Sequence, residues 1–151
     1  MTALYDILNK LKELNEAEEG INTVTTGTIS EVDLEKRTMY SLAHIIVNNA
    51  TLINSQVRFN ISIIWMDIVD ISKEEPTDKF RGNDNLHDVL NTLLATGTRV
   101  MNILKSGDPI ENGYELVGSP TFEPFQDRFE DAVAGWTCTF EVDVPNTMTI
   151  C

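Results

Sequence analysis

The most regular pattern in the chain lies in one segment, Val57-Arg58-Phe59-Asn60-Ile61-Ser62-Ile63-Ile64-Trp65-Met66-Asp67. Its odd-numbered residues from Val57 to Trp65 are all apolar, and this period of two is typical of a β-strand. The other face starts with polar side chains and becomes apolar at Ile64 and Met66. We therefore predict a strand over 57–67 that is exposed on one side at its start and covered on both sides at its end.

Further strands are predicted on both sides of this segment. Residues 136–144 alternate in the same way, with Trp136, Cys138, Phe140, Val142 and Val144 on one face. Residues 21–29 and 40–53 are rich in β-forming side chains, and Asn48-Asn49 is a possible turn inside the second of them. Residues 114–117 are expected to form a short strand, and 120–128 a loop rich in aromatic and carboxylate side chains.

Two segments have the spacing of amphipathic helices. In residues 2–19 and 83–105, leucine and other apolar side chains recur every three or four positions. Asp84 can cap the second helix and Gly107 can end it. Gly97, in the middle of that helix, costs up to about 1 kcal/mol against alanine. It indicates either a close helix–sheet contact or a bend.

This order of elements predicts one α+β domain over residues 1–151. A doubly wound parallel sheet would need a helix after nearly every strand. We therefore expect a mixed, mainly antiparallel sheet, with the N-terminal helix and one long central helix packed on it.

The charge balance is the unusual part of the composition. Asp and Glu number 24 against 11 Lys and Arg, giving a formal net charge of -13. Such a surface repels nucleic-acid phosphate unless it carries a basic patch. Lys36-Arg37 is the only adjacent basic pair in the sequence. Specific DNA or RNA binding is therefore not expected, and neither a signal peptide nor a membrane span is predicted.

Motifs that would carry chemistry are missing from the sequence. It has neither a G-x-G-x-x-G nor a Walker-type phosphate loop, and its two histidines, His44 and His87, lack ligands at metal-binding spacing. Cys138 alternates with aromatic residues and is read as a small core residue. We expect no enzymatic activity, no cofactor and no metal site.

Carboxylates leave one catalytic alternative open. The acids in question are Asp67, Asp70, Glu123, Asp127, Glu130 and Asp131. A solvated acidic surface is the simpler interpretation, because a working general acid needs a pKa raised by burial. The alternative is a pair of carboxylates that acts as an acid and a base.

Aromatic residues are the candidates for contacts with other chains. They gather in two segments, together with a proline and an arginine that can pair with an acid of a neighbour. For the three phenylalanines of the second segment, packing into the chain's own core is an equal alternative. The candidate interface residues are Pro76, Phe80, Arg81, Phe122, Phe125 and Phe129.

Several short motifs resemble the tail-terminator and tail-completion proteins of tailed bacteriophages. They are Tyr40-Ser41-Leu42-Ala43-His44, Trp65-Met66-Asp67-Ile68-Val69-Asp70, Asn85-Leu86-His87-Asp88-Val89-Leu90, Phe125-Gln126-Asp127-Arg128-Phe129-Glu130-Asp131 and Ala134-Gly135-Trp136. With an N-terminal amphipathic helix and a closing strand, the resemblance covers nearly the whole chain.

The resemblance implies an α+β structural protein of the virion. It implies a homo-oligomeric ring, commonly a hexamer, that caps the tail tube and joins it to the head or neck while DNA passes through. Tail tube, sheath and connector proteins would be its partners, and no catalytic residue is implied. The alternative from another class is a small intracellular adaptor whose acidic face binds a basic protein.

Overall fold

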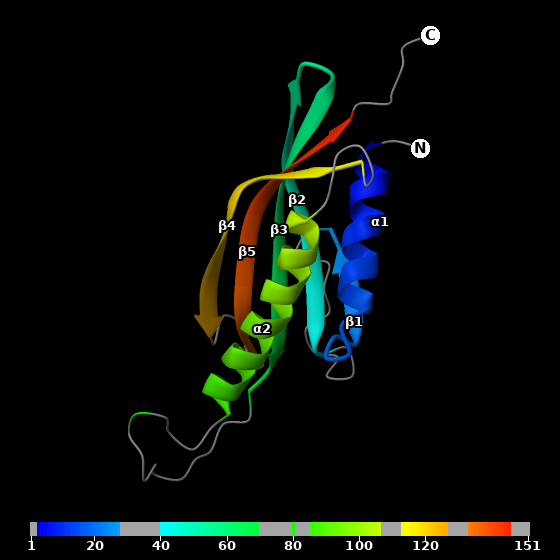
Figure 1. Cartoon of the computed structure of the whole chain (residues 1–151). Helices are drawn as coiled ribbons and strands as arrows, with labels where there is room; N and C mark the ends of the chain where they lie inside the picture. The colour runs from blue at the N-terminus through cyan, green and yellow to red at the C-terminus, as the bar shows by residue number, and fades with distance from the viewer. Residues whose placement is uncertain are drawn as a thin grey trace.

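The computed structural model describes residues 3–27, 40–69, 80, 85–106, 113–126 and 133–145. Within these residues the chain forms one sheet and two helices (Figure 1). In chain order the elements are α1 (Ala3–Glu16), β1 (Thr23–Thr26), β2 (Leu42–Ile53), β3 (Gln56–Ile68), α2 (Leu86–Lys105), β4 (Glu115–Gln126) and β5 (Val133–Pro145).

The sheet is mixed and mainly antiparallel, as predicted. Its strand order is β1-β2-β3-β5-β4. Only β1 and β2 run parallel, and the remaining neighbours are antiparallel. Both helices lie on the same face, with α2 against β4 and β5 and α1 beside β1 (Figure 1). The predicted α+β class and helix positions are therefore confirmed.

The central strand β3 has the two-sided character predicted from its sequence. Phe59, Ile61, Ile63 and Trp65 point toward the helices and belong to the main core cluster. On the opposite face, Ile64 and Met66 belong to a second buried cluster. This second cluster lies at one end of the sheet, and its buried members are Tyr40, Leu42, Ile64, Met66 and Val133.

The other end of that second face is polar. Arg58 of β3 forms two hydrogen bonds with Asp143 of β5, Nε–Oδ1 at 2.8 Å and Nη2–Oδ2 at 3.0 Å. Asn48 donates from Nδ2 to Asn60 Oδ1 and to Ser62 Oγ, each at 2.9 Å. One face of the sheet therefore changes from apolar to polar along its length.

Two sequence predictions about the strands are wrong. Asn48-Asn49 does not form a turn: β2 continues through it with a β-bulge, because the pairing register with β3 shifts between Val47 and Asn49. Residues 120–126, predicted as part of a loop, belong to β4, which pairs with β5 up to Gln126. Pro120 and Pro124 suggested a loop, but prolines are compatible with an edge strand.

The long helix begins slightly later than predicted. Asn85 precedes its first residue, Leu86, so the predicted cap at Asp84 is wrong by one position. Ser106 follows its last residue, Lys105, and donates its backbone N–H to the Asn102 carbonyl at 3.2 Å. Asp84 and Gly107 themselves lie outside the described residues.

Gly97 marks a close contact between α2 and the sheet. A β-carbon at this position would lie 2.9 Å from Trp65 Cζ3 and 3.0 Å from Phe122 Cε1. Both rings are part of the packed interior, and they stack with centroids 6.0 Å apart. Of the two alternatives for Gly97, a close approach of backbone to ring is therefore the one that this geometry supports.

Trp65 is also held by a buried hydrogen bond to α1. Its indole Nε1 donates to Asn15 Oδ1 at 2.8 Å, and Asn15 Nδ2 donates to the Leu11 carbonyl at 2.8 Å. Asn15 and Trp65 are both fully buried. Each polar group of the amide thus has a partner inside the core, which offsets the cost of removing it from water.

We expect Gly97→Ala to lower the free energy of unfolding. The added methyl group would overpack the Trp65–Phe122 stack, at a cost of about 1–3 kcal/mol, whereas better helix propensity would recover at most ~1 kcal/mol. Urea titration followed by tryptophan fluorescence measures the difference. Asn102→Ala, exposed on the same helix, is the control and should be neutral or slightly stabilising. An unchanged or raised stability of Gly97→Ala would contradict the close contact.

We expect Asn15→Leu to cost about 1–3 kcal/mol, because it leaves the buried Trp65 indole N–H without an acceptor. In a Trp65→Phe background, which has no indole N–H, the same substitution should cost less. Calorimetry on the four proteins of this double-mutant cycle measures the coupling. Strictly additive losses would show that the bond contributes nothing beyond packing.

Candidate functional site

The predicted interface phenylalanines are placed on different faces of the sheet. Phe122 lies on the helix side of β4, half-buried against Trp65. Phe125, three residues on, lies on the opposite face, half-buried against the second core cluster. These two side chains therefore pack at least partly on the chain's own core, which is one of the two alternatives that the sequence left open.

Of the remaining candidate interface residues, only Phe80 lies within the described part of the chain. Phe80 is 86% exposed, and its ring faces His87 of α2 with centroids 6.4 Å apart. Pro76, Arg81 and Phe129 lie outside the described residues. The structure therefore does not bring the six candidates together into one described patch.

The carboxylates of the catalytic alternative are also separated. Glu123 pairs with Thr137, which pairs with Ile64, so its side chain is on the face of the second cluster. Asp67 is on the face that carries the helices, and its Oδ1 accepts a hydrogen bond from the Ile68 N–H at 2.8 Å. Asp70, Asp127, Glu130 and Asp131 lie outside the described residues. Glu123 and Asp67 thus do not face each other.

The two histidines occupy the elements predicted for them. His44 is buried on β2, where Nδ1 lies 2.7 Å from Thr25 Oγ1 and Nε2 lies 3.0 Å from the Gly27 carbonyl oxygen. These contacts fasten β2 to β1. His87 is exposed on the first turn of α2. Among the described residues, no group of three or more His, Cys, Asp or Glu side chains could hold a metal ion.

Cys138 has the surroundings of a core residue. Its side chain is fully buried on β5, opposite Phe122 and Ile63. Burial raises the pKa of its thiol to about 12, because the thiolate would lose its hydration. The thiolate is the nucleophilic form, so at neutral pH this cysteine is unreactive.

A surface that the sequence analysis missed is the outer half of the β2–β3 hairpin. The hairpin projects beyond the ends of both helices (Figure 1). Its turn contains Asn54, whose φ of 53° lies in the left-handed region that asparagine tolerates. Leu52, next to this turn, is 68% exposed. Within the described chain, β1 pairs with β2 only as far as Ile45, so beyond it no described strand covers that edge.

The hairpin is uncharged in a strongly acidic chain. From Thr38 to Val57 the sequence has no Asp, Glu, Lys or Arg. Arg58, the first charged residue that follows, is paired with Asp143 across the sheet. This uncharged run is visible in the sequence and could have indicated the surface. The exposure of Leu52 could not be predicted in the same way, because it depends on where the helices end.

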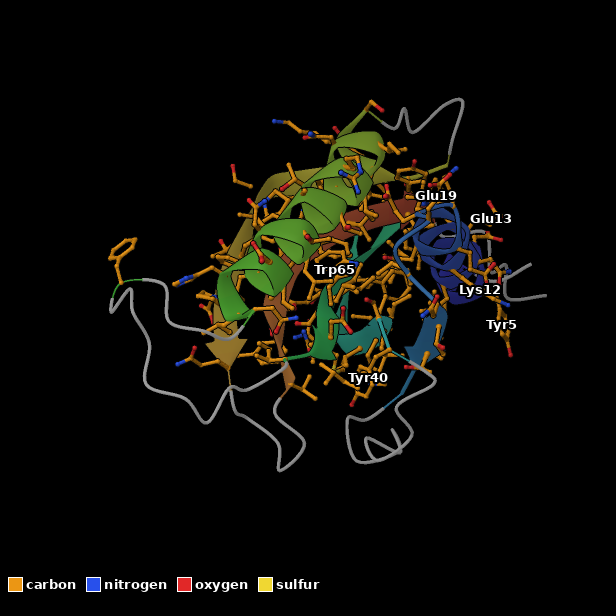
Figure 2. The ribbon with its side chains drawn as sticks, turned by 90° about the horizontal axis from the view of Figure 1, so that it is seen from below. Tyr5, Lys12, Glu13, Glu19, Tyr40 and Trp65 are labelled. Atoms are coloured by element: carbon orange, nitrogen blue, oxygen red, sulfur yellow. The ribbon has the colours of Figure 1, made fainter. Side chains whose placement is uncertain are left out.

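Two grooves border α1 on its two sides. The first, with a volume of about 310 Å³, is lined by Tyr5, Leu8 and Lys12 of α1 and by residues of β1 and β2, none of them acidic. The second, about 350 Å³, includes the carboxylates of Asp6 and Glu13. Figure 2 shows Tyr5 and Lys12 projecting from α1. The uncharged hairpin and the acid-free groove are therefore two separate surfaces that suit contact with another acidic chain.

The sequence matches no protein-family model and no curated protein. Neither described helix has both the length and the apolar character needed to cross a membrane.

We expect Cys138 to resist thiol reagents in the folded protein. In a Cys151→Ser variant it is the only thiol, and at pH 8 a disulfide reagent should react with it only as fast as the protein unfolds. Adding urea should raise the rate in parallel with loss of structure. Because the folded pKa is raised, protonation of the thiol favours the folded state up to the pKa of an unfolded cysteine, and this stability is lost as the pH rises toward 12. Rapid modification without urea would contradict the burial.

Proposed function

We propose that this chain is a non-catalytic structural protein that assembles into a homo-oligomeric ring. In this proposal the ring resembles those of bacteriophage tail terminators and tail-completion proteins. It caps the tail tube and joins it to the head or neck, and DNA passes through its lumen. The protein assembles in the host cytoplasm, acts within the virion and needs neither cofactor nor membrane.

One observation carries the proposal: an uncharged hairpin with an exposed leucine projects from a chain of net charge -13. Copies of such a chain repel one another, and this repulsion opposes association unless the contact surfaces lack acids. A charge-free projection avoids this repulsion, and a contact there would also bury the exposed apolar surface of Leu52. The burial of Cys138 and the separation of Glu123 from Asp67 favour contact rather than chemistry.

The acidic surface has a use in the proposed ring. A lumen lined by carboxylates repels phosphate, so DNA passes without forming the ion pairs that hold it to basic proteins. The half-buried Arg58–Asp143 pair and the more exposed Arg99–Glu18 pair, at 2.8 and 2.9 Å, each hold one of the few cations against an acid of the same chain.

The ring predicts a defined oligomer in solution or on tail tubes. Size-exclusion chromatography with light scattering should give a mass about six times the 16.9 kDa of one chain, and negative-stain electron microscopy should show rings with a central hole. If the ring forms only on the end of a tail tube, mixing the protein with purified tail tubes should produce it there. Monomers in all these conditions would overturn the proposal.

The adaptor alternative makes a different prediction for the same samples. An adaptor remains monomeric at high concentration and binds a basic protein with an affinity that falls steeply with added salt. Ring formation through an uncharged surface should instead change little between low and moderate salt, or strengthen as salt screens the repulsion between acidic copies.

A further inference from the structure

We infer that the hairpin tip around Leu52 of one copy inserts into the groove between α1 and β1 of the next copy. This inference rests on the proposed function and names the contact through which the ring would form. The hairpin and the groove are different surfaces of the same chain, so the contact is heterologous. Heterologous contacts repeat from copy to copy and close into a ring when the rotation permits.

The tip has the shape and chemistry of an inserting element. Leu52 pairs with Val57 across the hairpin, and both lie on the face that carries the helices. Because the tip extends past both described helices, neither α1 nor α2 covers Leu52, which is 68% exposed. The tight Asn54-Ser55 turn and the paired strands hold the tip in place, so little conformational freedom is lost on binding.

The groove matches that element in size and polarity. Its walls include Tyr5 and Leu8 of α1, Val24 of β1 and Ile45 of β2. Tyr5 is 62% exposed at the rim, an amphipathic side chain of the kind enriched in interfaces. A volume of about 310 Å³ is ample for a leucine and its neighbours on the turn.

Charge favours a second copy as the occupant. The groove lacks acids, and its one charged lining residue, Lys12, is 58% exposed and lies 3.8 Å from Glu16. An uncharged tip can therefore enter without burying a carboxylate, whereas the other groove, which contains Asp6 and Glu13 as well as Lys10, would have to desolvate two. In a chain of net charge -13, the uncharged run over residues 38–57 lets a second copy present such a tip without bringing carboxylates into the contact.

The test uses two variants that each remove one half of the contact. Leu52→Glu places a charge on the tip and leaves the groove intact, and Tyr5→Glu does the reverse. Each variant alone should show association weakened by at least about tenfold in sedimentation velocity, the loss expected for a central contact residue. Ile103→Glu is the matched control, because Ile103 is an exposed apolar residue on α2 outside both surfaces. It should assemble like the wild type.

Mixing the two variants gives the decisive result. The intact tip of Tyr5→Glu fits the intact groove of Leu52→Glu, so an equimolar mixture should form a heterodimer and nothing larger. Circular dichroism melts check that both variants fold.

Two outcomes overturn the inference while leaving the proposed ring standing. One is a wild-type ring that both variants form equally well, and the other is a pair of defective variants that do not associate when mixed. A wild-type protein that stays monomeric, also with tail tubes, overturns the ring and the inference together.

Discussion

The structure depends on how Trp65 is enclosed. Its indole ring lies between the sheet and α2, in contact with the position where Gly97 lacks a side chain. Its N–H is bonded to Asn15 of α1, and its face stacks on Phe122 of the edge strand β4. One residue of the central strand thus fixes the distance of α2, the rotation of α1 and the position of β4. α2 can approach the sheet this closely because residue 97 is glycine.

Much of this fold follows from periodicity in the sequence. The alternation in 57–67 and 136–144 predicted β3 and β5 correctly, because strands covered on one or both faces show the period of two clearly. The leucine spacing likewise predicted both helices. The two wrong strand predictions, at Asn48-Asn49 and over residues 120–126, fall where turn-forming residues occur inside strands. A bulge tolerates asparagine and an edge strand tolerates proline, and composition alone does not separate these cases from turns and loops.

The candidate surface was harder to predict than the fold. Phe122 and Phe125 were predicted as candidate contact residues, but they lie half-buried on opposite faces of β4. Whether an aromatic side chain on a strand faces the core or the solvent depends on the register of that strand. Residues 120–128 were predicted to form a loop, so the prediction assigned no register to Phe122 and Phe125. The uncharged run that includes Leu52 was visible, yet its exposure arises from a hairpin longer than the helices beside it.

The two prolines of β4 have a consequence for how sheets of different copies can meet. Proline has no N–H, so Pro120 and Pro124 interrupt the row of donors that an edge strand presents to solvent. A foreign strand that approached there would find gaps in its hydrogen-bond ladder. That border of the molecule is therefore less able to template open-ended stacking into fibrils, a hazard for any protein that accumulates at high concentration.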